Sequence, residues 1–312
     1  MDETYLVTGG AGFIGSHLVE SLVRQGGRVR VFDDLSTGLS ANLAQIEPAV
    51  EIIVGDVADA AAVERAVEGA GVIFHLAALA SVQRSIEAPA DTHRVCAGGT
   101  LNILDAARHT GVRRVVYAAS SSAYGIPAGD VQTESDLLAP LSPYAAAKLA
   151  GELYAQSFTA AFGLETVRLR FFNIFGPRQR ADSPYSGVIA LFAAALSAGR
   201  TPMIFGDGLQ TRDFTFVSDV VQALLRAAQT PGISGRVYNV GTGCGTSVLN
   251  LVAALNRQLG TNIVPRHAPS RAGDVRHSCA DISLAKRELG YEPAVSFEEG
   301  LAKTLAWYRQ QS

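Results

Sequence analysis

The 312-residue sequence predicts an α/β fold, a doubly wound parallel sheet joined to a smaller α/β region. Two observations support this. Over the first 170 residues, short β-branched runs alternate with longer helical patterns, and a glycine-rich turn joins the first run to the first helix. Strands are expected at 5–7, 29–32, 51–54, 72–74, 114–117 and 166–170, and helices between them at 13–25, 60–68 and 100–109. Such alternation places helices on both faces of one parallel sheet.

After about residue 175 the alternation loosens, and glycine and proline interrupt the chain more often. Helices are expected at 188–198, 220–228, 249–259 and 297–308. Ser296, followed three residues later by Glu299, predicts a capping box at the start of the last helix. We therefore expect two parts, 1–175 and 176–312, with some crossover of the chain between them. Because no linker-like segment separates them, they should form one rigid unit with a cleft.

Composition limits the class of protein. Hydrophobic residues make up 48% and charged residues 18%, which supports a sizeable core and argues against disorder. A net charge of −3 gives no electrostatic reason to expect nucleic acid as a partner. No apolar run approaches the roughly 18–20 residues that span a bilayer. The acidic start is unlike a secretory signal and the three cysteines are scattered, so a cytoplasmic location is expected. The six histidines show no paired ligand spacing, and no metal is expected.

The segment Thr8-Gly9-Gly10-Ala11-Gly12-Phe13-Ile14-Gly15 directly follows the first expected strand and opens the first helix. Glycines at 9, 12 and 15 allow a tight turn, close approach to a pyrophosphate and close packing of helix and strand. The helix N-terminus adds free N–H groups and a positive dipole end. This is the dinucleotide-binding signature of a Rossmann fold.

Asp33 lies 18 residues after Gly15, at the end of the second expected strand. A carboxylate there accepts hydrogen bonds from ribose hydroxyls and repels a 2′-phosphate, which favours NAD over NADP. An ordinary loop aspartate is the alternative interpretation. The ends of the other strands are further candidates, because ligands bind at the carboxyl edge of such sheets. The expected cofactor-binding residues are Gly9, Gly12, Phe13, Ile14, Gly15, Asp33, Asp34, Asp56, Val57, Leu76, Ala77, Ala78, Tyr144 and Lys148.

Tyr144 and Lys148 are four residues apart, behind Ser142 as a helix N-cap and Pro143 at the first helical position. This spacing puts the phenol and the ammonium on one helix face, where the cation is expected to lower the tyrosine pKa. Alone, such a pair is usually a solvated helix face. Its place after the fifth strand of a dinucleotide fold favours a catalytic pair instead. Ser120, Ser121 and Ser122 end that strand and could share a proton with a substrate or simply form a turn.

Together these residues resemble the extended short-chain dehydrogenase/reductase family over essentially the whole chain, and most closely its UDP-sugar 4-epimerases. Residues 8–17 resemble the family's cofactor loop, and Tyr144 and Lys148 its catalytic pair. Counting back four from Tyr124-Gly125 places the catalytic hydroxyl on Ser120. Segments 170–179, 206–208, 211–214 and 271–275 resemble those that contact the UDP-sugar.

The resemblance implies reversible oxidation of the sugar C4 hydroxyl, with NAD retained between catalytic cycles. It implies a 4-keto intermediate that rotates in the site, so that hydride returns to its opposite face. It also implies that 1–175 binds NAD, that 176–312 binds the UDP-sugar, and that helices near 97–109 and 144–162 pair in a homodimer. Arg212 and Arg271 would neutralise the diphosphate. The substrate-binding residues implied are Ser81, Ser121, Ser122, Asn173, Gly187, Val188, Arg212, Arg271, Asp274 and Ser278.

Three alternatives concern the reaction. The first is dehydration. Dehydrating relatives carry an Asp-Glu pair after the catalytic hydroxyl, where this chain has Ser121 and Ser122, so the sequence argues against it. A UDP-glucuronate 4-epimerase or decarboxylase stays open, because Arg180 could meet a carboxylate, although Asn173 fits the neutral-hexose relatives. A non-catalytic NAD sensor would usually lack the Tyr144 and Lys148 pair.

Ser278 bears on the choice of sugar. It stands where relatives confined to glucose and galactose carry a bulky tyrosine, so its small side chain leaves room for an N-acetyl group. The sequence therefore predicts UDP-GlcNAc and UDP-GalNAc as substrates, with or without UDP-Glc and UDP-Gal.

Overall fold

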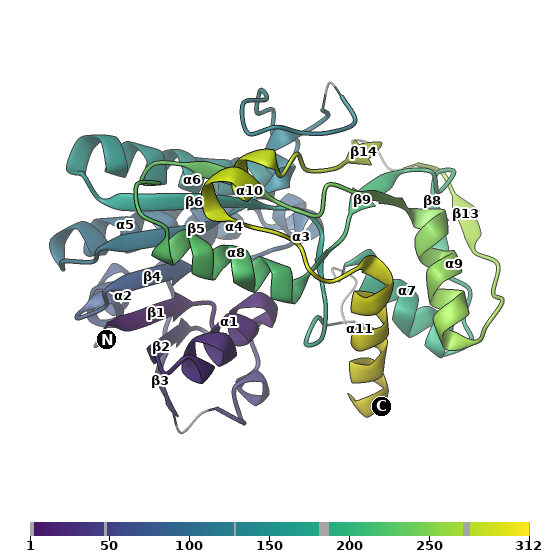
Figure 1. Ribbon diagram of the computed structural model, residues 1–312, viewed down its shortest axis with the longest axis horizontal. Coiled ribbons are helices and arrows are strands. Elements are labelled where there is room, and N and C mark those ends of the chain that lie inside the picture. The colour runs from purple at the N-terminus through teal and green to yellow at the C-terminus, as the bar shows by residue number, and fades with distance from the viewer. Residues whose placement is uncertain (1–2, 47–48, 128, 181–186, 271–274, 312) are drawn as a thin grey trace.

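The computed structural model describes residues 3–46, 49–127, 129–180, 187–270 and 275–311. Seven parallel strands form its main sheet, shown edge to edge in Figure 1. Their spatial order is β11 (Val237–Val240), β6 (Glu165–Phe171), β5 (Arg114–Ser120), β4 (Val72–His75), β1 (Thr4–Thr8), β2 (Arg28–Asp33) and β3 (Val50–Val54). The predicted fold class is confirmed, and each of the six predicted strands lies within an observed one.

Helices cover both faces of the sheet. One face carries α1 (Phe13–Arg24), α8 (Val217–Gln229) and α10 (Ser283–Leu289), which share one apolar core with the sheet. Figure 1 shows α1 and α8 on the near face. The opposite face carries α2 (Ala60–Val67), α5 (Gly99–His109) and α6 (Pro143–Phe162), over a second core. The short elements α3 (Val82–Glu87), α4 (Pro89–His93) and the π-helix η3 (Arg94–Gly98) lead into α5, while η1 (Ser40–Asn42) and η4 (Ser121–Tyr124) are 3-10 turns.

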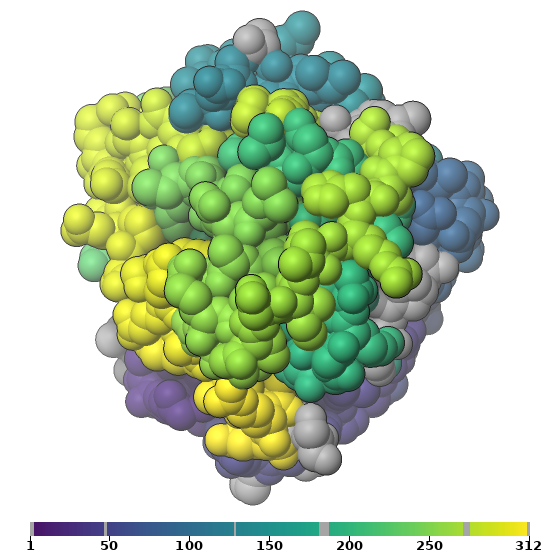
Figure 2. Space-filling model, turned by 90° about the vertical axis from the view of Figure 1, so that its right-hand side faces the viewer, coloured from purple at the N-terminus to yellow at the C-terminus, as the bar shows by residue number. Residues whose placement is uncertain are grey.

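A smaller α/β region lies beside the carboxyl edge of the sheet, on the right in Figure 1. It contains the strand pairs β7 (Ile174–Phe175) with β10 (Thr215–Phe216) and β8 (Met203–Phe205) with β13 (Arg266–Ala268), and the triplet β12 (Gly245–Ser247), β9 (Thr211–Asp213) and β14 (His277–Ser278). Its helices are α7 (Val188–Ser197), α9 (Val248–Leu259) and α11 (Phe297–Gln311). Figure 2 shows α9 between α7 and α11 on this end of the molecule. A third apolar core, which includes Phe175, Phe214 and Leu251, lies beneath them.

The two halves of the chain do not form two separate structural units. Strand β11 and helix α8 come from beyond residue 175 and yet complete the main sheet and its near layer. Strand β11 was not predicted. It has only four residues, and its pairing with β6 is what makes it a strand. A domain boundary at residue 175 therefore stays a prediction.

Two predicted helix caps have different outcomes. At α6, the Ser142 side chain accepts a hydrogen bond from Ala145 N at 3.1 Å, as expected for an N-cap. At α11, Ser296 Oγ accepts from Glu299 N at 3.2 Å. The reciprocal half of that capping box is wrong, because the Glu299 carboxylate instead pairs with Lys303 one turn along, at 2.7 Å. In the described part of the chain, no helix is both long and apolar enough to cross a membrane.

Candidate active site

A cavity of about 1380 Å³ opens at the carboxyl edge of the sheet, between it and the smaller region. Parallel strands end together at this edge, and the strand order reverses beside β1, which is where open α/β sheets bind ligands. Every predicted site residue that the structure describes lines this cavity. Arg271 and Asp274 lie outside the described residues.

The glycine turn after β1 leaves no room for a side chain at Gly9 or Gly15. Gly9 has φ +69°, and a Cβ there would lie 2.8 Å from Ala77 N. A Cβ on Gly15 would collide with the Gly9 carbonyl oxygen. Helix α1 begins after Gly12 with no side-chain cap and no acidic residue in its first turn. Its first N–H groups therefore face the cavity unneutralised, and this cradle fits a dinucleotide pyrophosphate.

Asp33, at the end of β2, is held by the backbone in one orientation. Its two carboxylate oxygens accept from Ala11 N and from Leu35 N, each at 2.9 Å. Each oxygen keeps a further lone pair for a ligand hydroxyl. Burial raises the pKa of this carboxyl, which the two backbone hydrogen bonds partly offset. Asp56, the predicted acid after β3, pairs with Arg94 Nη1 at 2.6 Å.

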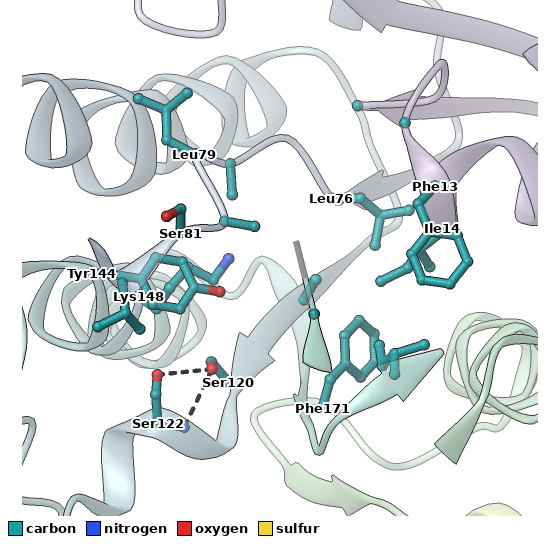
Figure 3. A pocket seen from close by; sticks show the side chains of 18 of the residues that line it. Phe13, Ile14, Leu76, Leu79, Ser81, Ser120, Ser122, Tyr144, Lys148 and Phe171 are labelled. Carbon is teal, nitrogen blue, oxygen red and sulfur yellow. Dashed lines mark hydrogen bonds between the residues drawn. The ribbon is translucent and has the colours of Figure 1, made fainter. Parts of the chain in front are cut away.

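Tyr144 and Lys148 extend from the first turns of α6 toward the cavity, opposite Phe13 and Ile14 at the start of α1 (Figure 3). Enclosure in the cavity raises the pKa of the Tyr144 phenol to about 12, and a hydrogen bond with Ser120 lowers it in part. Burial lowers the pKa of Lys148 to about 8. The prediction that the lysine would lower the tyrosine pKa is therefore wrong for the protein alone, because loss of solvent dominates the shift and the lowering contribution comes from Ser120 and not from Lys148.

The serines after β5 form a small hydrogen-bonded group below this pair (Figure 3). Ser120 Oγ lies 2.8 Å from Ser122 Oγ and accepts from Ser122 N at 3.2 Å. Ser120 thus caps η4 and also contacts Tyr144. Ser81 acts similarly at α3, where its side chain accepts from Arg84 N at 3.1 Å. Both serines are turn residues and cavity residues at once.

The far end of the cavity is built on β9 and β14. These strands are parallel, and Ser278 is the register partner of Arg212, so the two residues stand side by side. Asp213 is fully buried behind them and accepts from Thr242 N at 2.8 Å and from Ala280 N at 3.2 Å. Its carboxylate joins β9 to the segments on either side and fixes the position of Arg212 and Ser278.

Asn173, Gly187 and Val188 line the wall between the two ends. Asn173 O accepts from Thr215 N at 2.9 Å, which fixes the backbone of this lining residue. A Cβ on Gly187 would lie 3.0 Å from Gln179 Nε2, so a larger residue would press on its neighbour.

Several cavity residues were missed by the sequence analysis. At the cofactor end these include Ser36, Thr37 and Asn42, and elsewhere Arg84, Gln132 and Phe171. Asn42 Nδ2 donates to Ala11 O at 2.9 Å and so ties its loop to the glycine turn. Ser36 and Thr37 lie two and three residues after Asp34, near the acidic end of β2, and could have been found from that position. Gln132 lies in a long loop, and no local pattern signals it. Within the described ranges no group of three or more His, Cys, Asp or Glu side chains could hold a metal ion.

A family model described as "NAD dependent epimerase/dehydratase family" matches residues 5–241. The chain belongs to this family. As a member of the NAD-dependent epimerase/dehydratase family it is an enzyme whose cofactor is NAD, and the glycine cradle fits that cofactor.

Three relatives match this chain over essentially its whole length. It is 42% identical over 311 residues to a UDP-glucose 4-epimerase of Mycolicibacterium smegmatis, covering 98% of this chain and 99% of that one. A UDP-glucose 4-epimerase of Thermotoga maritima with UDP-glucose has a TM-score of 0.94 and 38% identity, covering 99% of both chains. A UDP-N-acetylglucosamine 4-epimerase of Methanobrevibacter ruminantium in complex with UDP-N-acetylmuramic acid has a TM-score of 0.95 and 36% identity, covering 100% of this chain and 99% of that one.

Proposed function

We propose that the protein interconverts the C4 epimers of a UDP-sugar, with UDP-GlcNAc and UDP-GalNAc as its preferred pair. The names of the relatives support the 4-epimerase reaction. The observation that carries the choice of sugar is the pairing of Ser278 with Arg212 at one register position on the cavity wall. With Arg212 holding the diphosphate, the hexose lies next to a small side chain, and an N-acetyl group has room there.

The cofactor end has the form that NAD needs. The backbone of Gly9, Gly12 and Gly15 and the start of α1 would receive the pyrophosphate, and Asp33 would receive the adenosine ribose hydroxyls. When bound, NAD supplies the electron acceptor and a positive charge on its nicotinamide ring. That charge favours a Tyr144 phenolate, which the protein alone does not.

Proton transfer is assigned to three side chains. Tyr144 takes the proton of the sugar 4-hydroxyl and later returns it, while Ser120 shares a hydrogen bond with the phenol. The Lys148 ammonium on the same helix face stabilises the phenolate. Ser122 holds Ser120 by two hydrogen bonds. Arg212 at the far end would bind the diphosphate and leave the hexose free to present its other face.

The direct test is to incubate the purified protein separately with UDP-GlcNAc, UDP-Glc and UDP-GlcA, and to resolve the C4 epimers. We expect UDP-GlcNAc to give UDP-GalNAc without added NAD, since the cofactor should copurify. Conversion of UDP-Glc with UDP-GlcNAc left untouched at high enzyme loading would show that the Ser278 argument is wrong.

A bulky residue at position 278 tests the same prediction, because it should fill the space proposed for the N-acetyl group. Ser278→Tyr should lower kcat/KM for UDP-GlcNAc by roughly 10- to 200-fold and leave UDP-Glc nearly unaffected. Thr246→Tyr is the matched control, because Thr246 is the register partner of Arg212 on its other side and is not among the cavity-lining residues described. Equal losses for both sugars in Ser278→Tyr would contradict a specificity role.

A second candidate is UDP-glucuronate 4-epimerisation or decarboxylation. It is favoured by the position of Arg84 and Arg180, both of which line the cavity and could receive a carboxylate. The UDP-GlcA incubation separates the two. Epimerisation gives UDP-galacturonate, and decarboxylation gives a UDP-pentose and carbon dioxide.

A further inference from the structure

The Lys148 ammonium rests on an aromatic ring. Its Nζ lies 4.3 Å from the centroid of the Tyr117 ring, and the side chain is only 3% exposed. Among the residues that the structure describes, Nζ makes no hydrogen bond or ion pair with a protein group. The ring face is therefore the contact that places this charge before any ligand binds.

Other charged groups near Lys148 act from a distance or are already paired. Glu152, one turn further along α6, raises the pKa of Lys148, as does the Cys96 thiol of η3, but burial outweighs both. The Glu152 carboxylate is occupied by Arg170, with hydrogen bonds of 3.0 Å and 2.6 Å. It does not contact the ammonium directly.

The remaining titratable neighbours are neutral near physiological pH. Burial, with the charge of Lys148, lowers the pKa of His75 on β4 to about 3. Tyr144, on the same face of α6, has its pKa raised to about 12. The Tyr117 phenol itself is buried, and its pKa lies well above the usual value. None of the three supplies a negative charge to the lysine, so the ring face of Tyr117 remains.

Tyr117 is itself held on both sides. It is fully buried on β5, and its hydroxyl donates to Lys148 O at 3.0 Å, inside α6. Its ring stacks on that of His75, its register partner on β4, with centroids 5.7 Å apart. His75 is fixed in turn, because its ring nitrogens lie 2.7 Å from Thr8 Oγ1 and 3.0 Å from Thr100 Oγ1. The chain of contacts thus runs from the end of β1, beside the glycine turn, to the lysine.

We propose that Tyr117 is a positioning residue of the proton-transfer site, which holds the Lys148 ammonium on its ring face. The negative face of the ring favours the charged lysine and offsets part of the cost of its burial. The hydroxyl of the same residue fixes the helical turn from which the lysine extends. The lysine charge thereby stays beside Tyr144. The effect on turnover rests on the proposed function, whereas the contact itself does not.

Lysine occurs at only three positions, 148, 286 and 303, so its charge state can be followed directly. We would label lysine with carbon-13 at Cε and titrate the full-length protein by NMR, assigning signals with Lys286→Arg and Lys303→Arg. Position 117 would carry phenylalanine, then phenylalanines with two and with three ring fluorines. Fluorine weakens the negative ring face and barely changes its size. We expect the pKa of Lys148 to fall stepwise, by about one unit over the series. The pKa values of Lys286 and Lys303 should not change across the series.

The matched control is the same series at Tyr238, which is also fully buried in the sheet and whose hydroxyl donates to Glu288 at 2.8 Å. That series should leave the Lys148 pKa unchanged. A constant Lys148 pKa across folded proteins fluorinated at 117 would overturn the proposal. In turnover, kcat on the alkaline side should fall along the series at constant KM. If the protein converts no UDP-sugar, the proposed function fails, and the NMR series still decides the role of Tyr117.

Discussion

At the scale of single residues, the role of the Tyr144 phenol in turnover should be separable from the binding of NAD. Tyr144→Phe removes the proton acceptor and leaves the ring in place, so we expect kcat to fall by roughly 10²- to 10⁴-fold. Bound NAD, measured after denaturation, should stay at the wild-type level. Tyr154→Phe is the control, because Tyr154 lies on the same helix and is 40% exposed. Full turnover by Tyr144→Phe would favour a protein that binds NAD without using this residue in catalysis.

Which residues meet in the site could be predicted better than how they ionise. Tyr144 and Lys148 lie four apart in one helix, so local geometry alone puts them on one face. The pKa of each depends on burial by elements distant in the sequence, including Tyr117 on β5 and Cys96 on η3. The sequence contains no signal for that enclosure, and the predicted direction for Tyr144 was accordingly wrong.

At the scale of elements, the turn between β1 and α1 should tolerate no Cβ at Gly9 or Gly15. Gly15→Ala would press a methyl group against the Gly9 carbonyl, and we expect a loss of about 1–3 kcal/mol in unfolding free energy. The turn would also open, so less NAD should copurify. Gly129→Ala is the control, because the nearest atom to its added Cβ is 4.0 Å away. Thermal unfolding and NAD content per chain give the two readouts. A Gly15→Ala protein with wild-type NAD content would contradict the proposal that this turn holds the NAD pyrophosphate.

Elements could be predicted where their own residues determine them. The strands β1 to β6 have β-branched runs, and α1 has glycine at its start, so both signals are local. Strands such as β14 have two residues and exist only through pairing with β9. The α11 cap shows the same limit, since Glu299 met a cation at i+4 instead of its expected partner.

At the scale of the whole molecule, the β-α alternation predicts a parallel, doubly wound main sheet, and hence that the site lies at the carboxyl edge of its strands. How the smaller region meets that edge could not be predicted. Cys279 N donates to Gln132 Oε1 at 2.9 Å across 147 positions of sequence, and this contact fastens the segment of Ser278 to a distant loop. Such pairings depend on complementary shapes that no periodic pattern records.

The outer face of α6 leads to a prediction about assembly. Leu153, Tyr154 and Phe162 are 54%, 40% and 54% exposed on this helix. Large apolar side chains left exposed on one helix commonly mark an interface. We therefore expect a homodimer in solution, with α6 and α5 packed against their copies, and a mass near twice the 32.7 kDa of one chain.

A charge on that face should dissociate the dimer. Leu153→Asp would bury an unpaired carboxylate in the interface, at a cost of several kcal/mol, so the protein should behave as a monomer in sedimentation. Leu137→Asp is the control, since Leu137 is 89% exposed and lies in the loop before α6, outside both helices. A wild-type monomer, or a Leu153→Asp dimer, would contradict this interface. Because α6 also carries Tyr144 and Lys148, turnover by the Leu153→Asp monomer would show whether that helix holds its catalytic geometry without a partner.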